Sequence, residues 1–563
     1  MTDEEHGHAW IHRFTEAETA RILAHELDPQ RVPEPDSRAL SGIRFAVKDN
    51  IDVAGIPTTA AFPPRAGRAA TRSATAVARL IHAGAVPVGK TNLDQFATGL
   101  VGTRSPFGAC HAVGHPGHIS GGSSSGSATA VASGQVELAL GTDTAGSGRV
   151  PAAFNGLVGL KPSRGLISTS GVLPACRSLD CVSIFTRSVA LARTAFDILA
   201  AFDPSDPYAR PKPGHSPHIA AVPRVIAVPK GGLDLESGHR EAWAAALEHA
   251  RTIAEYVVEV DLEPFLAAAR LLYQGPWIAE RWNAIAPLLG ARGLEHEGLD
   301  PAVRHVLTGA DAISGAATFA GFDELARLRR LTEAVWEKAD ALLLPTTPCH
   351  PTQAEVAADP IGVNTRLGMY TNFVNLLDLC AIAVPAETRP DGLPFGVQLI
   401  APAFADDRLL DLAATWTGEA AATTVEQPSP RSGRSHLAVV GAHMSGLPLN
   451  DALRELGAAF VRRTKTAPRY RLHHLPGTVP ARPGLFPVAD EQQGSEILAE
   501  VWELPHQAAG ALLETIPQPL GLGRITLADG TAVPGFLAHG PVPPGATDVS
   551  KFGGWRAYLE AGR

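Results

Sequence analysis

Apolar and polar positions alternate along most of the chain in a way that predicts helices and short buried strands in turn. Residues 73–90 read "SATAVARLIHAGAVPVGK", in which Val77, Leu80 and Ile81 recur at the spacing of one helix face. Gly84 ends this helix, and the apolar run "AVPVG" after it predicts a strand.

The same alternation continues through the following segments. Small residues in "SSSGSATAVASG" predict a helix, "VELALG" predicts a strand, and "RVPAAFNGLVGLKP" predicts a further helix and turn. "ADALLLPTTP" and "CAIAVPAE" are typical of buried strands, and "RPDGLPFGVQLIAP" predicts a hairpin with Asp391 and Gly392 at its turn. This pattern favours an α/β core around a largely buried sheet.

A change of composition divides the chain near residues 426–436. This stretch, "EQPSPRSGRSH", is rich in Pro, Ser, Gly and Arg and predicts an interdomain linker. Residues 437–563 carry fewer helical patterns and many Gly and Pro, which predicts a smaller β-rich or α+β domain that folds by itself. We therefore expect a larger domain over residues 1–425, then the linker and the second domain.

Composition narrows the class of protein. The 563 residues are enough for two or three domains, and 45% hydrophobic residues supply a sizeable core. A formal charge of -9 disfavours a nucleic-acid partner. The acidic start lacks a signal-peptide pattern, and no apolar run approaches the roughly 18 residues of a membrane span. We expect a soluble, cytoplasmic protein with no membrane partner.

The cysteines and histidines show no metal-binding pattern. Five cysteines, outside CxxC spacing, indicate reduced thiols, and the 21 histidines include no H-E-x-x-H motif. We expect neither a metal nor a cofactor.

Two stretches rich in serine and glycine are the first candidates for chemistry: "GGSSSGSATA" at residues 121–130 and "DTAGSGR" at residues 143–149. A flexible linker is disfavoured because patterned apolar segments follow at once, and a phosphate loop because the G-x-x-x-x-G-K-[ST] order is absent. The third interpretation is that the two stretches form the base of an active site. Glycines would let backbone N–H groups approach a substrate oxygen, and serines would supply hydroxyls for proton transfer. Helix caps or turn hydroxyls would explain the same serines without chemistry.

A serine nucleophile needs a base, and no G-x-S-x-G elbow indicates a Ser-His-Asp arrangement. Lys48 ends the apolar strand in "FAVKDNIDVAGIPTTA" and is a candidate. Its pKa, about 10.4 in solution, must fall to about 7 to 8, which desolvation in an apolar pocket achieves. Most lone lysines are surface charges, so residue type alone does not select Lys48.

With both motifs in order, roughly residues 40–420 resemble the amidase signature family. "GGSSSGSA" through "LALGTDTAGSGRVPAAFNGLVGLKPSRG" is similar to the family's signature, and "AVKDNIDVAG" to its lysine segment. The resemblance implies amide hydrolysis on a mixed central sheet covered by helices. It also implies Ser147 as nucleophile, Ser123 as the bridging serine before an unusual cis peptide, and Lys48 as base. Lys48 would take a proton from Ser123, which takes one from Ser147.

The resemblance further implies an oxyanion hole formed by backbone N–H groups of the turn that carries the nucleophile. Here these belong to Thr144, Ala145, Gly146 and Ser147. Many family members have Gly-Gly-Ser at the last three positions, so the methyl of Ala145 constrains the turn while the backbone donor survives.

Within this family the chain is similar to the allophanate hydrolases. The similarity is carried by "LDQFATGLVGTRSPFG", "GVLPACRSLDCVSIF", "LLYQGPWIAERW", "LGMYTNFVNLLDLCAIAVP" and, in the C-terminal region, "VVGAHMSGLPLN". It implies hydrolysis of allophanate, a small anionic amide, to ammonia and carbon dioxide through an acyl-enzyme. It also implies that Tyr273 and Arg281 hold the substrate carboxylate, since a buried anion needs a cation.

Tyr273 and Arg281 meet only if the chain between them is not one helix. Eight residues of unbroken helix rise about 12 Å, so we expect Gly275 and Pro276 to break the helix and bring the two side chains together. The competing interpretation is that Arg281 is a solvated or ion-paired helix residue beside Glu280.

Several alternatives stay open at this stage. A broader small-amide amidase and an amidotransferase A-type subunit would share the same motifs. Tyr370 and Asn372 either line the pocket or pack beside it. The C-terminal domain of the allophanate hydrolases is associated with decarboxylation of the first product or with assembly. We expect a homodimer, coupled to an upstream urea carboxylase or a biuret-producing pathway.

Overall fold

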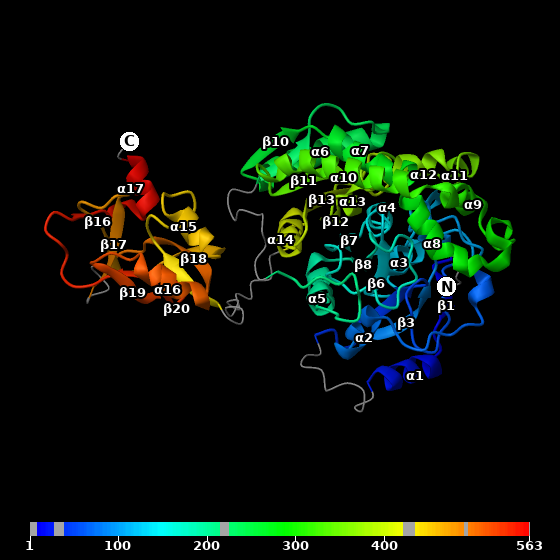
Figure 1. Ribbon diagram of the computed structural model, residues 1–563, viewed down its shortest axis with the longest axis horizontal. Helices are drawn as coiled ribbons and strands as arrows, with labels where there is room; N and C mark the ends of the chain where they lie inside the picture. Colours follow the sequence, from blue (N-terminus) through cyan, green and yellow to red (C-terminus); the bar gives the residue numbers. More distant parts are fainter. Residues whose placement is uncertain (1–7, 28–38, 214–224, 420–433, 489–493, 562–563) are drawn as a thin grey trace. The chain divides into compact units, whose positions relative to one another are not determined.

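The computed structural model describes residues 8–27, 39–213, 225–419, 434–488 and 494–561 (Figure 1). The chain forms two compact units. The larger unit contains most of residues 1–423, and the smaller unit consists mainly of residues 424–563. Most of the expected linker lies outside the described residues, and strand β14 (Arg434–Val439) begins within its last three positions.

A mixed sheet forms the centre of the larger unit. Among the described residues it has eleven strands, in the order β1-β3-β2-β6-β8-β7-β12-β13-β11-β9-β10. β2 pairs in parallel with β3 and β6, whereas β6 with β8 and β12 with β13 are antiparallel. The strands are β1 Trp10–Arg13, β2 Arg44–Lys48, β3 Val86–Thr91, β6 Leu138–Asp143, β7 Val158–Lys161, β8 Cys181–Thr186, β9 Val225–Pro229, β10 Tyr256–Val260, β11 Ala341–Pro345, β12 Leu379–Pro385 and β13 Gly396–Pro402.

Helices cover this sheet (Figure 1). α5 packs on β8, and α13 and α14 pack on β12, and their apolar side chains join one large core with the strands. α3 packs on β6, and its apolar side chains belong to a separate, smaller core. A short hairpin, β4 (His111–Ala112) and β5 (His115–Ile119), lies outside the main sheet. The helices are α1 Glu16–Glu26, α2 Thr75–His82, α3 Ser125–Ala132, α4 Val150–Phe154, α5 Val189–Leu199, α6 Ser237–Ile253, α7 Glu263–Gln274, α8 Trp277–Leu289, α9 Pro301–Leu307, α10 Gly315–Trp336, α11 Gln353–Ala358, α12 Gly362–Leu367, α13 Phe373–Leu376 and α14 Asp406–Trp416.

The elements predicted from periodicity are largely present. α2 buries Val77, Leu80 and Ile81, and β3 follows it after the turn at Gly84. The predicted hairpin is formed by β12 and β13, with Gly392 at positive φ in the loop between them.

One prediction was wrong: residues after α4 form a strand, β7, where a turn was expected. β7 has four residues, too few for periodicity to identify, and it contains a glycine. It becomes a strand because β8 and β12 pair with it on both sides.

The smaller unit is rich in strands, as predicted. Its sheets have the orders β15-β18-β14-β20-β19 and β17-β16-β21. It has its own apolar core around the fully buried Trp555. Its other elements are β15 Ala459–Lys465, β16 Tyr470–Leu475, β17 Arg482–Pro487, β18 Leu498–Pro505, β19 Leu520–Thr526, β20 Ala532–Ala538, β21 Thr547–Asp548, α15 Asn450–Glu455, α16 His506–Glu514 and α17 Trp555–Ala561.

All five cysteines are buried free thiols. In the described part of the chain, no helix combines the length and apolar character that a membrane crossing requires. The same residues contain no group of three or more His, Cys, Asp or Glu side chains arranged to hold a metal ion.

Candidate active site

Lys48 ends strand β2 with its amine inside the protein. The side chain is fully buried, and Nζ donates hydrogen bonds to Ser123 Oγ and Thr142 Oγ1, each at 2.8 Å. Both acceptors are neutral hydroxyls, and no carboxylate oxygen among the described residues accepts a hydrogen bond from the amine. Burial lowers the pKa of Lys48 to about 7. A large fraction of the amine is therefore neutral at physiological pH and able to accept a proton.

Ser123 stands in a segment that Asp94 holds in place. A cis peptide bond is present as expected, but it joins Gly122 to Ser123 and so precedes the serine rather than following it. The N–H of Asp94 donates to the Ser123 carbonyl at 3.1 Å, and a Cβ at Gly122 would collide with the Asp94 carboxylate. Only glycine therefore fits at position 122. Helix α3 begins two residues beyond Ser123.

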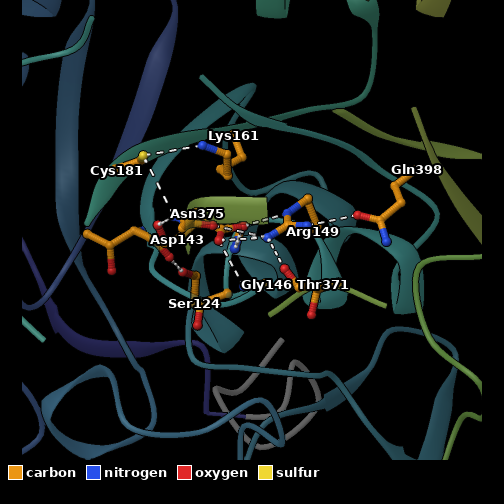
Figure 2. Close-up of polar contacts among 12 residues, drawn as sticks. Ser124, Asp143, Gly146, Arg149, Lys161, Cys181, Thr371, Asn375 and Gln398 are labelled. Carbon is orange, nitrogen blue, oxygen red and sulfur yellow. Dashed lines mark hydrogen bonds and ion pairs between the residues drawn. The ribbon is translucent and has the colours of Figure 1, made fainter. Parts of the chain in front are cut away.

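The carboxylate of Asp143, the last residue of β6, holds the main chain around Ser147. Asp143 Oδ1 accepts the N–H of Gly146 at 2.8 Å, and Oδ2 accepts the N–H of Gly148 at 3.0 Å. Arg149 donates to the same carboxylate from Nε at 2.9 Å and from Nη2 at 3.0 Å (Figure 2). The residues on both sides of Ser147 are thus tied to one buried ion pair.

Contacts from distant elements reinforce this turn. Arg149 Nη1 donates to Gln398 Oε1 on β13 at 2.8 Å, and Asn375 Nδ2 on α13 donates to the Asp143 carbonyl at 2.8 Å (Figure 2). Burial opposes ionisation of Asp143, but the Arg149 guanidinium more than offsets it and the pKa of Asp143 is lowered. The carboxylate of Asp143 is therefore ionised, and both of its oxygens accept hydrogen bonds from the turn and from Arg149.

Three of the four N–H groups expected in the oxyanion hole are unengaged. The N–H of Gly146 donates to Asp143, whereas those of Thr144, Ala145 and Ser147 donate no hydrogen bond within the described part of the chain. Gly146 has φ of 134°, and a Cβ there would collide with Thr371. The turn therefore presents free donors beside Ser147 in a conformation that requires glycine.

The structure provides one of the two links of the expected proton relay. Lys48 is hydrogen-bonded to Ser123, but Ser147 Oγ donates to the Gly99 carbonyl at 3.5 Å and has no hydrogen bond to Ser123. The link from Ser123 to Ser147 remains a prediction. Catalytic hydrogen bonds are often long without substrate and shorten when it binds.

Tyr273 and Arg281 lie on two helices joined by a sharp break. α7 ends at Gln274 and α8 begins at Trp277, with Gly275 and Pro276 between them, as predicted. The break brings the Arg281 Cζ to 5.9 Å from the centre of the Tyr273 ring. The two side chains therefore meet although they are two helical turns apart in sequence.

Arg281 is a buried cation that forms no ion pair within the described part of the chain, although the charges of Asp180 and Glu280 lie near enough to act on its pKa. Its side chain is 2% exposed, and Nη1 donates to Thr98 Oγ1 at 2.8 Å. Among the described residues it forms no ion pair with a carboxylate; Glu280 instead accepts from the N–H and hydroxyl of Ser178, each at 2.7 Å. The expected competitor is thus engaged elsewhere, and the guanidinium has donors available for an anion.

A cavity of about 140 Å³ lies elsewhere in the larger unit, and none of the proposed catalytic or substrate-binding residues lines it. One of its lining residues, Asp180, accepts a hydrogen bond from the hydroxyl of Thr144 in the nucleophile turn. Burial raises the pKa of Asp180. The cavity is lined by Thr169, Ser170, Gly171, Val172, Pro174, Arg177, Asp180, Ser205, Asp206 and Pro207.

Sequence reasoning missed several residues that build the site. Asp94, Thr98 and Asp143 are short polar residues inside motifs that were recognised for their serines, glycines and apolar positions. Asp143 could have been found, because a carboxylate directly before a glycine-rich turn commonly accepts its N–H groups. Tyr370, left open by the sequence, is buried in the core and its hydroxyl donates to the Asp234 carbonyl at 3.3 Å.

Comparisons with known proteins identify the family to which the chain belongs. The family model for amidases matches residues 5–410, and the model for the allophanate hydrolase C-terminal domain matches residues 435–560. The fold and the site define a hydrolase that acts on amide C–N bonds. The chain belongs to the amidase family.

Individual relatives cover different parts of the chain. A urea amidolyase of Lachancea kluyveri is 42% identical over 580 aligned positions, and the alignment covers 98% of this chain but 31% of that protein. A crystal structure of Kluyveromyces lactis allophanate hydrolase is similar with a TM-score of 0.79 and 40% identity, covering 100% of this chain and 94% of the other. The A subunit of the glutamyl-tRNA(Gln) amidotransferase of Symbiobacterium thermophilum is 36% identical over 422 aligned positions, and the alignment covers 69% of this chain and 85% of that protein.

Proposed function

We propose that this chain hydrolyses allophanate and releases ammonia and carbon dioxide. The observation that carries the proposal is the guanidinium of Arg281, buried beside Tyr273 with no carboxylate partner in the described structure. Allophanate joins a urea amide to a carboxylate, so its anionic end suits Arg281 while its amide faces Ser147. The similarity to proteins named urea amidolyase and allophanate hydrolase supports the same substrate.

In the first half of the proposed reaction, Lys48 acts as base. Its neutral amine takes the proton of Ser123, which takes that of Ser147 as Ser147 Oγ attacks the amide carbonyl. The negative charge that develops on the carbonyl oxygen is held by the free N–H groups of Thr144, Ala145 and Ser147. These donors are fixed before substrate binds, so little reorganisation opposes the attack.

In the second half, the proton returns to the leaving nitrogen. The Lys48 ammonium gives it back through Ser123, the C–N bond breaks, and ammonia leaves. The acyl-enzyme on Ser147 then carries a carbonyl bonded to the carboxylated nitrogen. Water attacks this ester by the same relay and releases N-carboxycarbamate, whose decarboxylation completes the reaction.

The setting of the enzyme is also proposed. We infer a cytoplasmic homodimer whose substrate comes from an enzyme that carboxylates urea or from one that forms allophanate from biuret. The urea amidolyase relative supports the first source. The matched part makes up 31% of that protein, which is named for its action on urea and has room for a second activity.

An ammonia-release assay tests the substrate directly. Allophanate, its stable analogue malonamate, neutral biuret and acetamide are compared at equal concentration with the purified chain. We expect kcat/KM for allophanate to exceed that for the neutral amides by about 100-fold, the value of a desolvated charge-assisted contact. Comparable rates on acetamide would instead support a broad amidase. Activity that required charged transfer RNA together with a second protein would support an amidotransferase.

A further inference from the structure

We propose that Thr98 is a positioning residue that gives the site its selectivity for an anionic amide. Its hydroxyl holds the guanidinium of Arg281 at a set distance from Ser147. The inference rests on the proposed function and names a residue that the sequence motifs did not assign.

Thr98 and its neighbour connect the two ends of the site. Arg281 Nη1 donates to Thr98 Oγ1 at 2.8 Å, and Ser147 Oγ donates to the carbonyl of Gly99 at 3.5 Å. Consecutive Cα atoms lie about 3.8 Å apart across a trans peptide. One dipeptide of set length therefore links the anion-binding group to the nucleophile.

The loop that carries this dipeptide is built around a buried carboxylate. Asp94 Oδ2 accepts the N–H groups of Val101 and Gly102 at 3.1 and 3.0 Å, and Oδ1 accepts that of Arg104 at 3.0 Å. Arg104 Nη1 in turn donates to the Thr98 carbonyl at 3.0 Å. The main chain at Thr98 is thus held from both sides.

Close packing leaves this loop little freedom to shift. A Cβ on Gly99 would lie 2.6 Å from Asp94 Oδ2, and Gly99 has φ of 155°. The N–H of Asp94 also donates to the carbonyl of Ser123. The loop therefore contacts the bridging serine, the nucleophile and the anion-binding arginine at once.

The hydroxyl of Thr98 is oriented to accept from Arg281. Its own proton points to the Phe96 carbonyl at 3.2 Å, so its lone pairs face the guanidinium. A guanidinium has five N–H donors, and Thr98 uses one, leaving the others for a carboxylate. Without this acceptor, Arg281 loses its orientation relative to Ser147. A neutral amide makes no ion pair with Arg281, so its KM should not depend on the orientation of the guanidinium.

Two substitutions separate this role from a general loss of structure. Thr98→Val keeps the shape and removes the hydroxyl, and Thr98→Ser keeps the hydroxyl and removes the methyl. For Thr98→Val we expect KM for allophanate to rise about tenfold, the value of one hydrogen bond to a charged group, with KM for biuret within about twofold of wild type. Thr98→Ser should restore KM for allophanate. Because KM does not depend on the folded fraction, partial unfolding cannot imitate this split.

A binding measurement makes the test independent of turnover. Malonamate is titrated by calorimetry into full-length Ser147→Ala protein with and without Thr98→Val, and we expect Kd to rise about tenfold. That rise would support the inference even if wild type failed to release ammonia from allophanate, which would refute only the proposed function. Unchanged malonamate affinity, equal losses on allophanate and biuret, or no rescue by Thr98→Ser would overturn the inference and leave the proposed function standing.

Discussion

Lys48 and Arg281 are both cationic residue types buried in one site, and neither has a carboxylate partner among the described residues, yet their expected chemistry is opposite. Lys48 is fully buried and Arg281 is 2% exposed. Burial lowers the pKa of Lys48 to about 7, so this residue becomes a base. Arginine keeps its proton in proteins, so Arg281 stays charged and favours an anion instead.

Two other buried cations show what a carboxylate partner changes. Lys90, on the strand beside that of Lys48, forms an ion pair with Asp49 at 2.8 Å, and Arg149 pairs with Asp143 at 2.9 Å. These pairs satisfy their charges internally and hold the local main chain. Among these four residues, the missing carboxylate rather than burial distinguishes the groups proposed to act on substrate.

The comparison depends first on the nucleophile that both unpaired groups are proposed to serve. Ser147→Ala should lower kcat for allophanate by about 10,000-fold or more, because no acyl-enzyme can form. Ammonia release is the measurement. The control is Ser237→Ala at the exposed start of α6, which should leave kcat unchanged. Near-wild-type turnover by Ser147→Ala would remove the basis for the proposed roles of Lys48 and Arg281.

The internally paired group predicts a large effect on stability. Asp143→Asn leaves the buried Arg149 without its counter-charge, so the free energy of unfolding of the larger unit should fall by about 3 to 5 kcal/mol. Denaturant unfolding measures this. The matched control is Asp411→Asn, which removes an ion pair with Arg193 at the surface, where the Asp411 side chain is 55% exposed. This variant should lower the free energy of unfolding by less than about 1 kcal/mol. Equal costs for the two variants would argue against the buried pair as a structural element.

The unpaired arginine predicts an effect that depends on the charge of the substrate. Arg281→Ala should lower kcat/KM for allophanate by about 100-fold, because the carboxylate loses its buried cation. The same variant should change kcat/KM for biuret far less, and both are measured by ammonia release. Equal losses on the two substrates would remove the carboxylate role and make Arg281 resemble Arg149.

The two unpaired groups are also expected to influence each other through charge. Because the neutral form of Lys48 is the base, kcat/KM should fall about tenfold per pH unit below pH 7 and level off above it. Besides burial, the positive charge of Arg281 helps to lower the pKa of Lys48. In Arg281→Ala, the pKa of Lys48 should therefore rise, and the acidic limb of the biuret profile should move to higher pH.

That shift is the smallest of these effects and the most specific. The profile of Ser237→Ala serves as the control. A limb that stays in place would mean that Arg281 and Lys48 do not interact, and a limb absent from wild type would mean that Lys48 is not the titrating base.

Prediction from sequence succeeded where a motif or a period is local. The helix face of α2, the break at Gly275 and Pro276, and the place of Lys48 at the end of an apolar strand were visible in short stretches, whereas the family resemblance selected Lys48 as the base. It failed at β7, which is a strand only because two neighbours pair with it. It also missed the engagement of the Gly146 N–H by Asp143, since the N–H groups of a turn look equivalent until the side chains around them are placed.

By itself, the sequence determined which reactive groups this protein has and in what order they occur. The tertiary structure decided their state. Lys48 meets Ser123 across 75 positions of the chain, and Arg281 meets Thr98 across 183. Whether an amine is neutral, or a guanidinium unpaired, depends on the exclusion of water and on neighbours that only folding brings together.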